Sequence, residues 1–476
     1  MKNQSNTFLI LSMAFLAACS GGGQQSAQQE EVQSKFTGAK GEVKLMTLDP
    51  GHFHAALVQK TMYEQVDPTV YVYAPEGNDV QDHLGRIEGF NTRDENPTNW
   101  NEKVYTGNDY LEKMISEKPG NVMVVSGNNA KKTKYIKAAA DAGINIFADK
   151  PMAINTKDFA LLEEAFKSAE ANDVLLYDIM TERHEITTII QRELSKIPEV
   201  FGVLKDGTPE EPAITKESVH HFFKTVAGNP IKRPDWFFDT EQQGEGIVDV
   251  TTHLVDLIQW EAFPEQILQK EDVEMLNARR WTTPLSPEQF KKVTQTDAFP
   301  EFLQKDVVDG KLQVYSNGEM TYKLKGKYAK VSVIWNFEAP EGAGDTHYST
   351  MRGSLCDVMI KQSEEENYQP TVYIRATIDE GLETFEGGLQ KAVDQDIATM
   401  YPGLKLVKLE DKLWTVDIPG EYKIGHEAHF GQVTEKFLRY LKWGKLPEWE
   451  VPNMITKYYT TTRALEMAVS TSSKGE

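Results

Sequence analysis

The sequence predicts an α/β fold in which a Rossmann-type parallel sheet is followed by an α+β domain with a large open, mainly antiparallel sheet. Between residues 41 and 180, short apolar segments alternate with helical segments, which is the pattern of right-handed βαβ units. After residue 180, β-prone segments follow one another with turn residues between them, as in an antiparallel sheet. The 476 residues suffice for two such domains, over 41–180 and 181–476.

In the first half, buried strands are expected where short apolar runs occur, at 43–48, 69–73, 121–125, 144–148 and 174–177. Helical patterns begin at His54 and cover 110–116, 134–142 and 156–171. The polar stretch 78–105 fits neither pattern. A stretch of this length inside a compact domain is expected to be a functional loop or disordered.

The second half contains β-prone runs at 311–315, 320–324, 329–335 and 372–374. A helix is expected before them, over 247–261, and two more after them, over 433–443 and 454–468. Pro452 fits the first turn of the last helix.

The N-terminus has the features of a bacterial lipoprotein signal. Lys2 precedes an apolar run over 8–16, and the run ends in Leu16-Ala17-Ala18-Cys19. The run is too short to cross a bilayer. We therefore expect a signal peptide over 1–18, a lipidated Cys19, a flexible tether over 19–40, and a location in the bacterial cell envelope, facing the periplasm or in the outer membrane.

Cysteine usage and charge exclude some classes of protein. Cys356 is the only cysteine besides Cys19, so no disulfide framework is expected. The formal net charge of −21 would repel a phosphate backbone, so no nucleic-acid partner is expected. Contact with the membrane is expected through the lipid anchor alone.

The turn after the first strand is where a doubly wound fold holds a dinucleotide, normally with G-x-G-x-x-G. Gly51 occupies the last glycine position, but Met46 and Leu48 occupy the first two. An acid that closes the second strand would bind the ribose, and the candidates are Glu76 and Asp79. This region alone leaves open a Rossmann-like sheet that binds no nucleotide.

Two later segments carry a family resemblance. Residues 139–153 read AADAGINIFADKPMA, and residues 244–260 read GEGIVDVTTHLVDLIQW. In this order they resemble the A-G-x-x-V-x-x-E-K-P-L-A and G-G-G-x-x-x-D-x-G-x-H-x-x-D-x-x-x-W segments of the glucose–fructose oxidoreductase and inositol dehydrogenase superfamily, often written Gfo/Idh/MocA. Asp149 replaces the usual Glu. Residues 51–57 resemble the family's G-x-x-H-A-x-A-L, and 126–132 stand where the family has T-P-N-x-x-H, with Asn128 for Pro and Lys132 for His.

The resemblance implies NAD or NADP as the cofactor. An exported enzyme cannot draw freely on the cytoplasmic NAD pool, so we expect this cofactor to be tightly bound. The residues at the matching positions, together with the acid after the second strand, are the expected cofactor contacts: Gly51, His54, Glu76, Asn128, Asn129, Asp149, Lys150 and Pro151. It also implies that Lys150, Asp249 and His253 form the catalytic set.

The chemistry of these three residue types agrees with that role. Lys150 follows a strand at its carboxyl end, where such folds bind ligands, and its ammonium group can bind a substrate hydroxyl. Asp249 and His253 are four apart on one predicted helix face, and Asp256 follows on the same face. A histidine suits the proton transfer that accompanies hydride transfer, while Asp249 can bind a sugar hydroxyl or orient the imidazole.

Other candidates are less specific. Arg183 and Asp256 are candidate substrate contacts, and an ion pair between the domains is an equal alternative for Arg183. Asp345 and His347 lie in or beside a Gly-rich loop and are expected near the mouth of the substrate site. No metal site is predicted, because the pairs 220–221 and 426/429 do not supply enough histidines with ligand spacing.

These observations favour a nicotinamide-dependent oxidoreductase that acts on a sugar, polyol or related hydroxyl compound, with a small carbohydrate substrate and a homo-oligomer as the default assembly. Two alternatives stay open. One is an NAD-dependent glycosidase that uses a transient oxidation–elimination cycle. The other is a non-catalytic ligand-binding lipoprotein on the same fold, favoured by the missing glycines and by Asp149 but not by the intact Lys150, Asp249 and His253.

Overall fold

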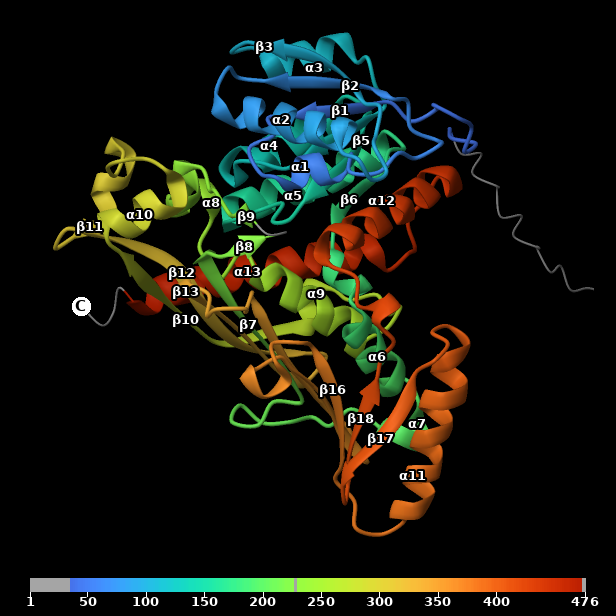
Figure 1. Cartoon of the computed structure of the whole chain (residues 1–476). Coiled ribbons are helices and arrows are strands. Elements are labelled where there is room, and N and C mark those ends of the chain that lie inside the picture. The colour runs from blue at the N-terminus through green and yellow to red at the C-terminus, as the bar shows by residue number, and fades with distance from the viewer. Residues whose placement is uncertain (1–34, 227–228, 473–476) are drawn as a thin grey trace, which may run out of the picture. The chain divides into compact units, whose positions relative to one another are not determined.

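Two sheets form the framework of the chain in the computed structural model, which describes residues 35–226 and 229–472 (Figure 1). The chain that follows residue 33 forms one compact unit. The expected signal peptide, Cys19 and most of the expected tether lie outside the described residues.

The first sheet is parallel and has the strand order β3-β2-β1-β4-β5-β6. Its strands are β1 (Leu45–Leu48), β2 (Thr69–Ala74), β3 (Asn101–Thr106), β4 (Val122–Val125), β5 (Asn145–Asp149) and β6 (Leu176–Ile179). The order of the strands reverses between β1 and β4, which pair directly. In folds of this kind, ligands bind at the carboxyl ends of the strands beside that reversal.

Helices connect these strands: α1 (His54–Leu57), α2 (Asn78–Thr92), α3 (Tyr110–Glu117), α4 (Asn129–Asp141) and α5 (Thr156–Ala171). The prediction for 78–105 was wrong, because α2 and β3 occupy most of it. Val80, His83 and Ile87 are buried at helical spacing, but the polar residues between them hide this pattern in the sequence.

The second sheet has the order β10-β12-β13-β7-β14-β15-β16-β18-β17, and β11 pairs with β12. All its neighbours are antiparallel except β13 and β7. Its strands are β7 (Ile214–Phe223), β10 (Val273–Leu285), β11 (Val307–Val308), β12 (Lys311–Leu324), β13 (Lys327–Glu338), β14 (Thr346–Arg352), β15 (Cys356–Lys361), β16 (Thr371–Ala376), β17 (Lys405–Glu410) and β18 (Leu413–Asp417). The predicted fold class is confirmed.

The α-helices of this half are α6 (Ile186–Ser195), α7 (Pro198–Phe201), α8 (Thr240–Gln243), α9 (Thr251–Ala262), α10 (Pro287–Thr294), α11 (Leu382–Lys391), α12 (His426–Trp443) and α13 (Glu450–Ser472). Two short strands, β8 (Thr225–Val226) and β9 (Asn229–Pro230), pair with each other. Among the described residues, no helix is both long and apolar enough to cross a membrane.

Two details of the second half differ from the prediction. The runs 311–315 and 320–324 belong to one strand, β12, because Gly318 does not make a turn but lies against Ile247, where a Cβ atom would come within 2.6 Å. Helix α9 begins at Thr251 rather than at residue 247, so Asp249 lies in the turn before the helix.

The two C-terminal helices return to the first sheet and complete its core (Figure 1). The ring of Phe437 in α12 stacks on Phe147 of β5, with 4.6 Å between the ring centres, and also faces Tyr177 of β6. Residues at both ends of the chain therefore contribute to one hydrophobic core.

Replacing Phe437 by Ala should lower the free energy of unfolding by about 3–5 kcal/mol, because a buried ring is lost and a cavity remains. Phe437 is 2% exposed, whereas Trp443 at the end of the same helix is 57% exposed. Urea unfolding of Phe437→Ala and of the control Trp443→Ala measures the difference. Equal midpoints would contradict the role of α12 in this core.

Candidate active site

The carboxyl ends of β1, β4 and β5 bring three loops to one edge of the first sheet. Asp49 to Phe53 follow β1, Ser126 to Asn128 follow β4, and Lys150 and Pro151 follow β5. This edge lies at the reversal of strand order, where a ligand site is expected.

Lys150 links this edge to the second half of the chain. Its Nζ atom donates to Oδ1 of Asp249 over 2.8 Å, and Oδ2 of Asp249 accepts from Nε2 of Gln243. Lys132, from α4, donates to the main-chain oxygen of Asp149. Burial lowers the pKa of Lys132 to about 8. Lys150 and Asp249 are thus in direct contact, as an ion pair between residues 99 positions apart.

His253 lies in the first turn of α9, where the charge of Lys150 acts on its imidazole. Burial, followed by the charges of Lys150 and His426, lowers the pKa of its imidazole well below 6.5. Its Nδ1 atom is buried and has no hydrogen-bond partner in the described part of the chain. His253 is therefore neutral at pH 7 and carries a nitrogen that no protein group occupies.

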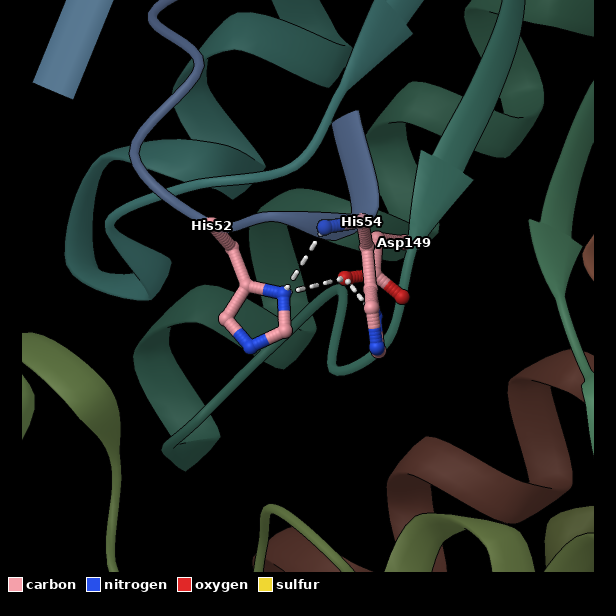
Figure 2. A group of neighbouring side chains, drawn as sticks. All are labelled: His52, His54 and Asp149. Carbon is pink, nitrogen blue, oxygen red and sulfur yellow. Dashed lines mark hydrogen bonds and ion pairs between the residues drawn. The ribbon is translucent and has the colours of Figure 1, made fainter. Parts of the chain in front are cut away.

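His52, His54 and Asp149 form a second group at the same edge (Figure 2). Nδ1 of His54 donates to Oδ2 of Asp149 over 3.0 Å, and Nδ1 of His52 lies 3.9 Å from the same oxygen. Burial lowers the pKa of both histidines, that of His52 further. Burial alone would raise the pKa of Asp149, but His54 and Lys132 outweigh it and hold that pKa well below its usual range.

A cavity of about 590 Å³ opens beside the first turn. It is bordered by Gly51 and His52, by Asp79 of α2, and by Arg233 and Trp236 from the second half. Nε1 of Trp236 donates to Oδ2 of Asp79 over 2.9 Å. The cavity thus offers an acid after β2 and cationic groups beside the turn that follows β1.

The crevice between the β1 and β4 loops is closed. The main-chain N–H groups of Gly51 and His52 both donate to the carbonyl oxygen of Ser126, each over 3.2 Å. A Cβ atom on Gly127 would lie 2.3 Å from the oxygen of Asp49, so the two loops touch. Helix α1 has only four residues.

These observations decide how well a nicotinamide dinucleotide would fit. The cavity beside Asp79 fits the adenosine end, where an acid after the second strand binds the ribose. The Lys150–Asp249 pair and His253 fit the nicotinamide end of the cofactor, where the hydride is transferred. The pyrophosphate in the middle of the cofactor does not fit, because the N–H groups that would bind it donate to the carbonyl oxygen of Ser126 instead.

The other predicted cofactor contacts lie around this edge with different roles. Asn128 caps α4 and donates to Oε1 of Gln242, and Asn129 donates to the main-chain oxygen of Gln243. Pro151 follows Lys150 through a cis peptide bond. Glu76 is exposed and does not border the cavity, whereas Asp79 does.

Arg183 and Asp256 lie in a buried ion-pair network. Arg183 donates to both oxygens of Asp256, at 2.6 and 2.7 Å, and pairs with Glu450 of α13. Lys457 of the same helix bridges Asp256 and Asp178. Each charge is matched by a partner. Both partners of Arg183 belong to the second half of the chain, so its ion pairs lie within that half and not between the two predicted domains.

Asp345 and His347 lie at the start of β14. Asp345 accepts from Nδ1 of His220 over 2.8 Å and pairs with Lys224, and His220 and Lys224 hold its pKa well below the usual range despite burial. Burial lowers the pKa of His347 to about 3, and its Nε2 atom has no partner within the described residues.

The sequence did not predict three residues that lie at this site: His52, Lys132 and Arg233. A signal existed for His52, because His52-Phe53-His54 lies in the turn region that follows a predicted strand end. No such signal existed for Arg233, which reaches the site from a loop of the second half and donates to the main-chain oxygens of His221 and Phe222.

Comparison with known proteins identifies the family. The family model described as "Putative oxidoreductase C terminal domain" matches residues 190–469. A crystal structure from Parabacteroides merdae, described as a putative oxidoreductase, has 62% sequence identity and a TM-score of 0.90, covering 92% of this chain and 99% of that one. The chain belongs to this oxidoreductase family. The resemblance to the Gfo/Idh/MocA superfamily and the expectation of an oxidoreductase are thereby confirmed.

More distant structures share the fold. Levoglucosan dehydrogenase in complex with NADH and levoglucosan has 12% identity and a TM-score of 0.56, covering 90% of this chain and 97% of that one. KijD10, a 3-ketoreductase from Actinomadura kijaniata in complex with NADP, has 11% identity and a TM-score of 0.53, covering 88% and 97%. A comparison with curated proteins gives no match.

Proposed function

We propose that this chain is a nicotinamide-dependent oxidoreductase that acts on a hydroxyl or carbonyl group of a sugar, polyol or related compound. The contact of 2.8 Å between Lys150 and Asp249 carries the proposal, because it joins the two motif segments beside His253. Two distant structures of the same fold, named as a levoglucosan dehydrogenase with NADH and a 3-ketoreductase with NADP, support this chemistry.

In this proposal the three residues divide the work on one hydroxyl group. The Lys150 ammonium donates a hydrogen bond to the substrate oxygen, while Asp249 holds Lys150 in place and accepts from a neighbouring hydroxyl. Neutral His253 accepts the hydroxyl proton. The nicotinamide, when bound, accepts or supplies the hydride.

Cofactor binding requires a local change at the first turn. The N–H groups of Gly51 and His52 have to leave the carbonyl oxygen of Ser126 before they can donate to phosphate oxygens. Arg233 and Lys232 border the adjoining cavity and supply positive charge on that side. Only molecules with an open first turn can bind the cofactor. The apparent affinity is therefore the affinity of the open form multiplied by the fraction of molecules that are open.

The closed crevice also favours a second candidate function, a carbohydrate-binding protein that has kept the fold without using a nicotinamide. In that case Lys150, Asp249 and His253 bind hydroxyl groups and the contacts of Ser126 stay intact. The two candidates differ in whether a dinucleotide binds.

Location, anchoring and assembly are also part of the proposal and rest on the sequence. The segment that ends in Leu16-Ala17-Ala18-Cys19 supports lipidation of Cys19 and a place in the bacterial cell envelope. An exported enzyme cannot draw freely on the cytoplasmic NAD pool, which supports a tightly held cofactor. A homo-oligomer is proposed as the assembly of the open sheet.

Binding of a nicotinamide dinucleotide is the first test. Protein purified from its native host and then denatured should release NAD or NADP, and cofactor-free protein should bind one of them in calorimetry. Asp79→Asn should weaken this binding, because Asp79 borders the cavity, and the exposed Asp94→Asn should not. Failure of both cofactors to bind at millimolar concentration would favour the carbohydrate-binding protein.

His253→Asn should lower turnover by about 10²–10⁴-fold, because a general base is lost. The dissociation constant of the cofactor should change little, because His253 lies beside Lys150 and not beside the cavity. His184→Asn is the matched control, because His184 is half-buried in the short helix after β6 and outside the site. A fully active His253→Asn would refute the catalytic assignment.

The pH profile of oxidation follows from the lowered pKa of His253. A base whose pKa lies well below 6.5 is unprotonated at pH 7, so its contribution to kcat/KM is constant above pH 7 and is lost only as the pH falls. Burial places the pKa of Glu182 at about 7 and that of Lys132 at about 8, so both can add inflections. The inflection that His253→Asn removes should therefore lie below pH 6.5, and one near pH 7 would contradict the lowered pKa.

A further inference from the structure

His52, His54 and Asp149 place three possible metal-ligand atoms together. Each of the three residues offers one ligand atom, and these atoms lie within 4.8 Å of one another. Both histidine side chains face the same oxygen of Asp149 (Figure 2). The two histidines come from the turn after β1, and Asp149 is the last residue of β5. These side chains therefore meet because two strands of one parallel sheet end at the same edge.

Nδ1 of His52 and Oδ2 of Asp149 face each other without a hydrogen bond between them. The main-chain N–H of His54 donates to Nδ1 of His52 over 3.3 Å, so this nitrogen is an acceptor and carries no proton. It faces the Asp149 oxygen at 3.9 Å, which is beyond hydrogen-bond distance. Two ligands that are each about 2.0–2.2 Å from one zinc ion can be about 4 Å apart. A cation bound there would replace the His54 N–H at Nδ1 of His52 and release the proton from Nδ1 of His54.

The surroundings hold Asp149 in position as a ligand. Oγ of Ser126 donates to Oδ2 of Asp149 over 2.8 Å, which orients the carboxylate. Lys150 is the nearest residue in sequence that could repel a cation, but its ammonium group is paired with Asp249. Lys132 donates to the main-chain oxygen of Asp149 rather than to its carboxylate.

The group is accessible from the cavity. His52 is one of the residues that border it, whereas His54 and Asp149 are buried behind. An ion bound by three protein ligands would keep an open position, and this is the arrangement of catalytic rather than structural zinc sites. Two imidazoles and one carboxylate suit Zn²⁺ and similar divalent transition metals better than Mg²⁺ or Ca²⁺, which prefer oxygen ligands.

We propose that His52, His54 and Asp149 bind one divalent transition-metal ion, preferably Zn²⁺, beside the Lys150–Asp249 pair. An ion there could bind an oxygen of the same substrate that Lys150 contacts. The proposal does not depend on the proposed oxidoreductase function, because it rests on the three side chains alone. The competing account is a hydrogen-bonded His54–Asp149 pair that takes no ion.

Calorimetric titration of the untagged full chain with ZnCl₂, after removal of metals by EDTA and dialysis, tests the proposal. One Zn²⁺ per chain should bind. His52→Gln and Asp149→Asn should each weaken binding by at least about tenfold, the loss that even an indirect ligand contact produces. His83→Gln is the control, because His83 borders the same cavity but lies outside the group of three.

Thermal unfolding in EDTA identifies variants that fail to fold. If Asp149→Asn does not fold, His52→Gln decides alone, because the His52 side chain is partly exposed and donates no hydrogen bond within the described residues. Zn²⁺ should raise the melting temperature of the unaltered chain and not that of His52→Gln. Absence of saturable binding, or equal affinity in all variants, would overturn the metal site.

The nicotinamide test on the same zinc-free protein keeps the two proposals separate. Zinc binding without NAD or NADP binding would leave the metal site standing and remove the oxidoreductase proposal. Binding of NAD or NADP without zinc binding would remove the metal site and leave the oxidoreductase proposal standing.

Discussion

The ion pair between Lys150 and Asp249 is the contact on which the candidate site depends. It joins the end of a strand in the first sheet to the turn that precedes α9 in the second half. Parallel strands deliver Lys150 to the edge, and the buried network of Arg183, Asp256 and Lys457 ties α9 to α13. Since α13 also packs on the first sheet, the two halves are held in one arrangement around this pair.

Several polar groups at this edge already form hydrogen bonds with one another. The carbonyl oxygen of Ser126 accepts hydrogen bonds from both N–H groups of the first turn, and Asp149 accepts from His54 and Ser126. Asn128 and Asn129 donate hydrogen bonds to residues of α8. A ligand that needs these groups has to replace existing hydrogen bonds, so each new bond contributes little net free energy. The open Nδ1 of His253 is a contrast, because it has no protein partner to lose among the described residues.

Sequence reasoning reached the fold class and the Lys150–Asp249–His253 group because both rest on local signals. Alternation of strands and helices fixes the place of a residue such as Lys150 at a sheet edge before any contact is known. Sequence reasoning failed where an element depends on contacts between residues that are far apart in the sequence. Gly318 resembled a turn because its close neighbour, Ile247, is 71 positions away. Helix α2 was hidden because only Val80, His83 and Ile87 of its residues are buried.

The departures from the family pattern are concentrated in one place. Met46 and Leu48, where the family has glycines, are fully buried core residues, so the first turn is not shaped for a phosphate. Asp149 stands where the family has Glu, and it is the residue that His54 and Ser126 contact, with His52 next to them. Lys150, Asp249 and His253 are unchanged. The chain therefore matches the family pattern at Lys150, Asp249 and His253 and departs from it at the first turn and at Asp149. The resulting cluster of two imidazoles and one carboxylate lies where the turn after β1 meets the end of β5, beside the Lys150–Asp249 pair.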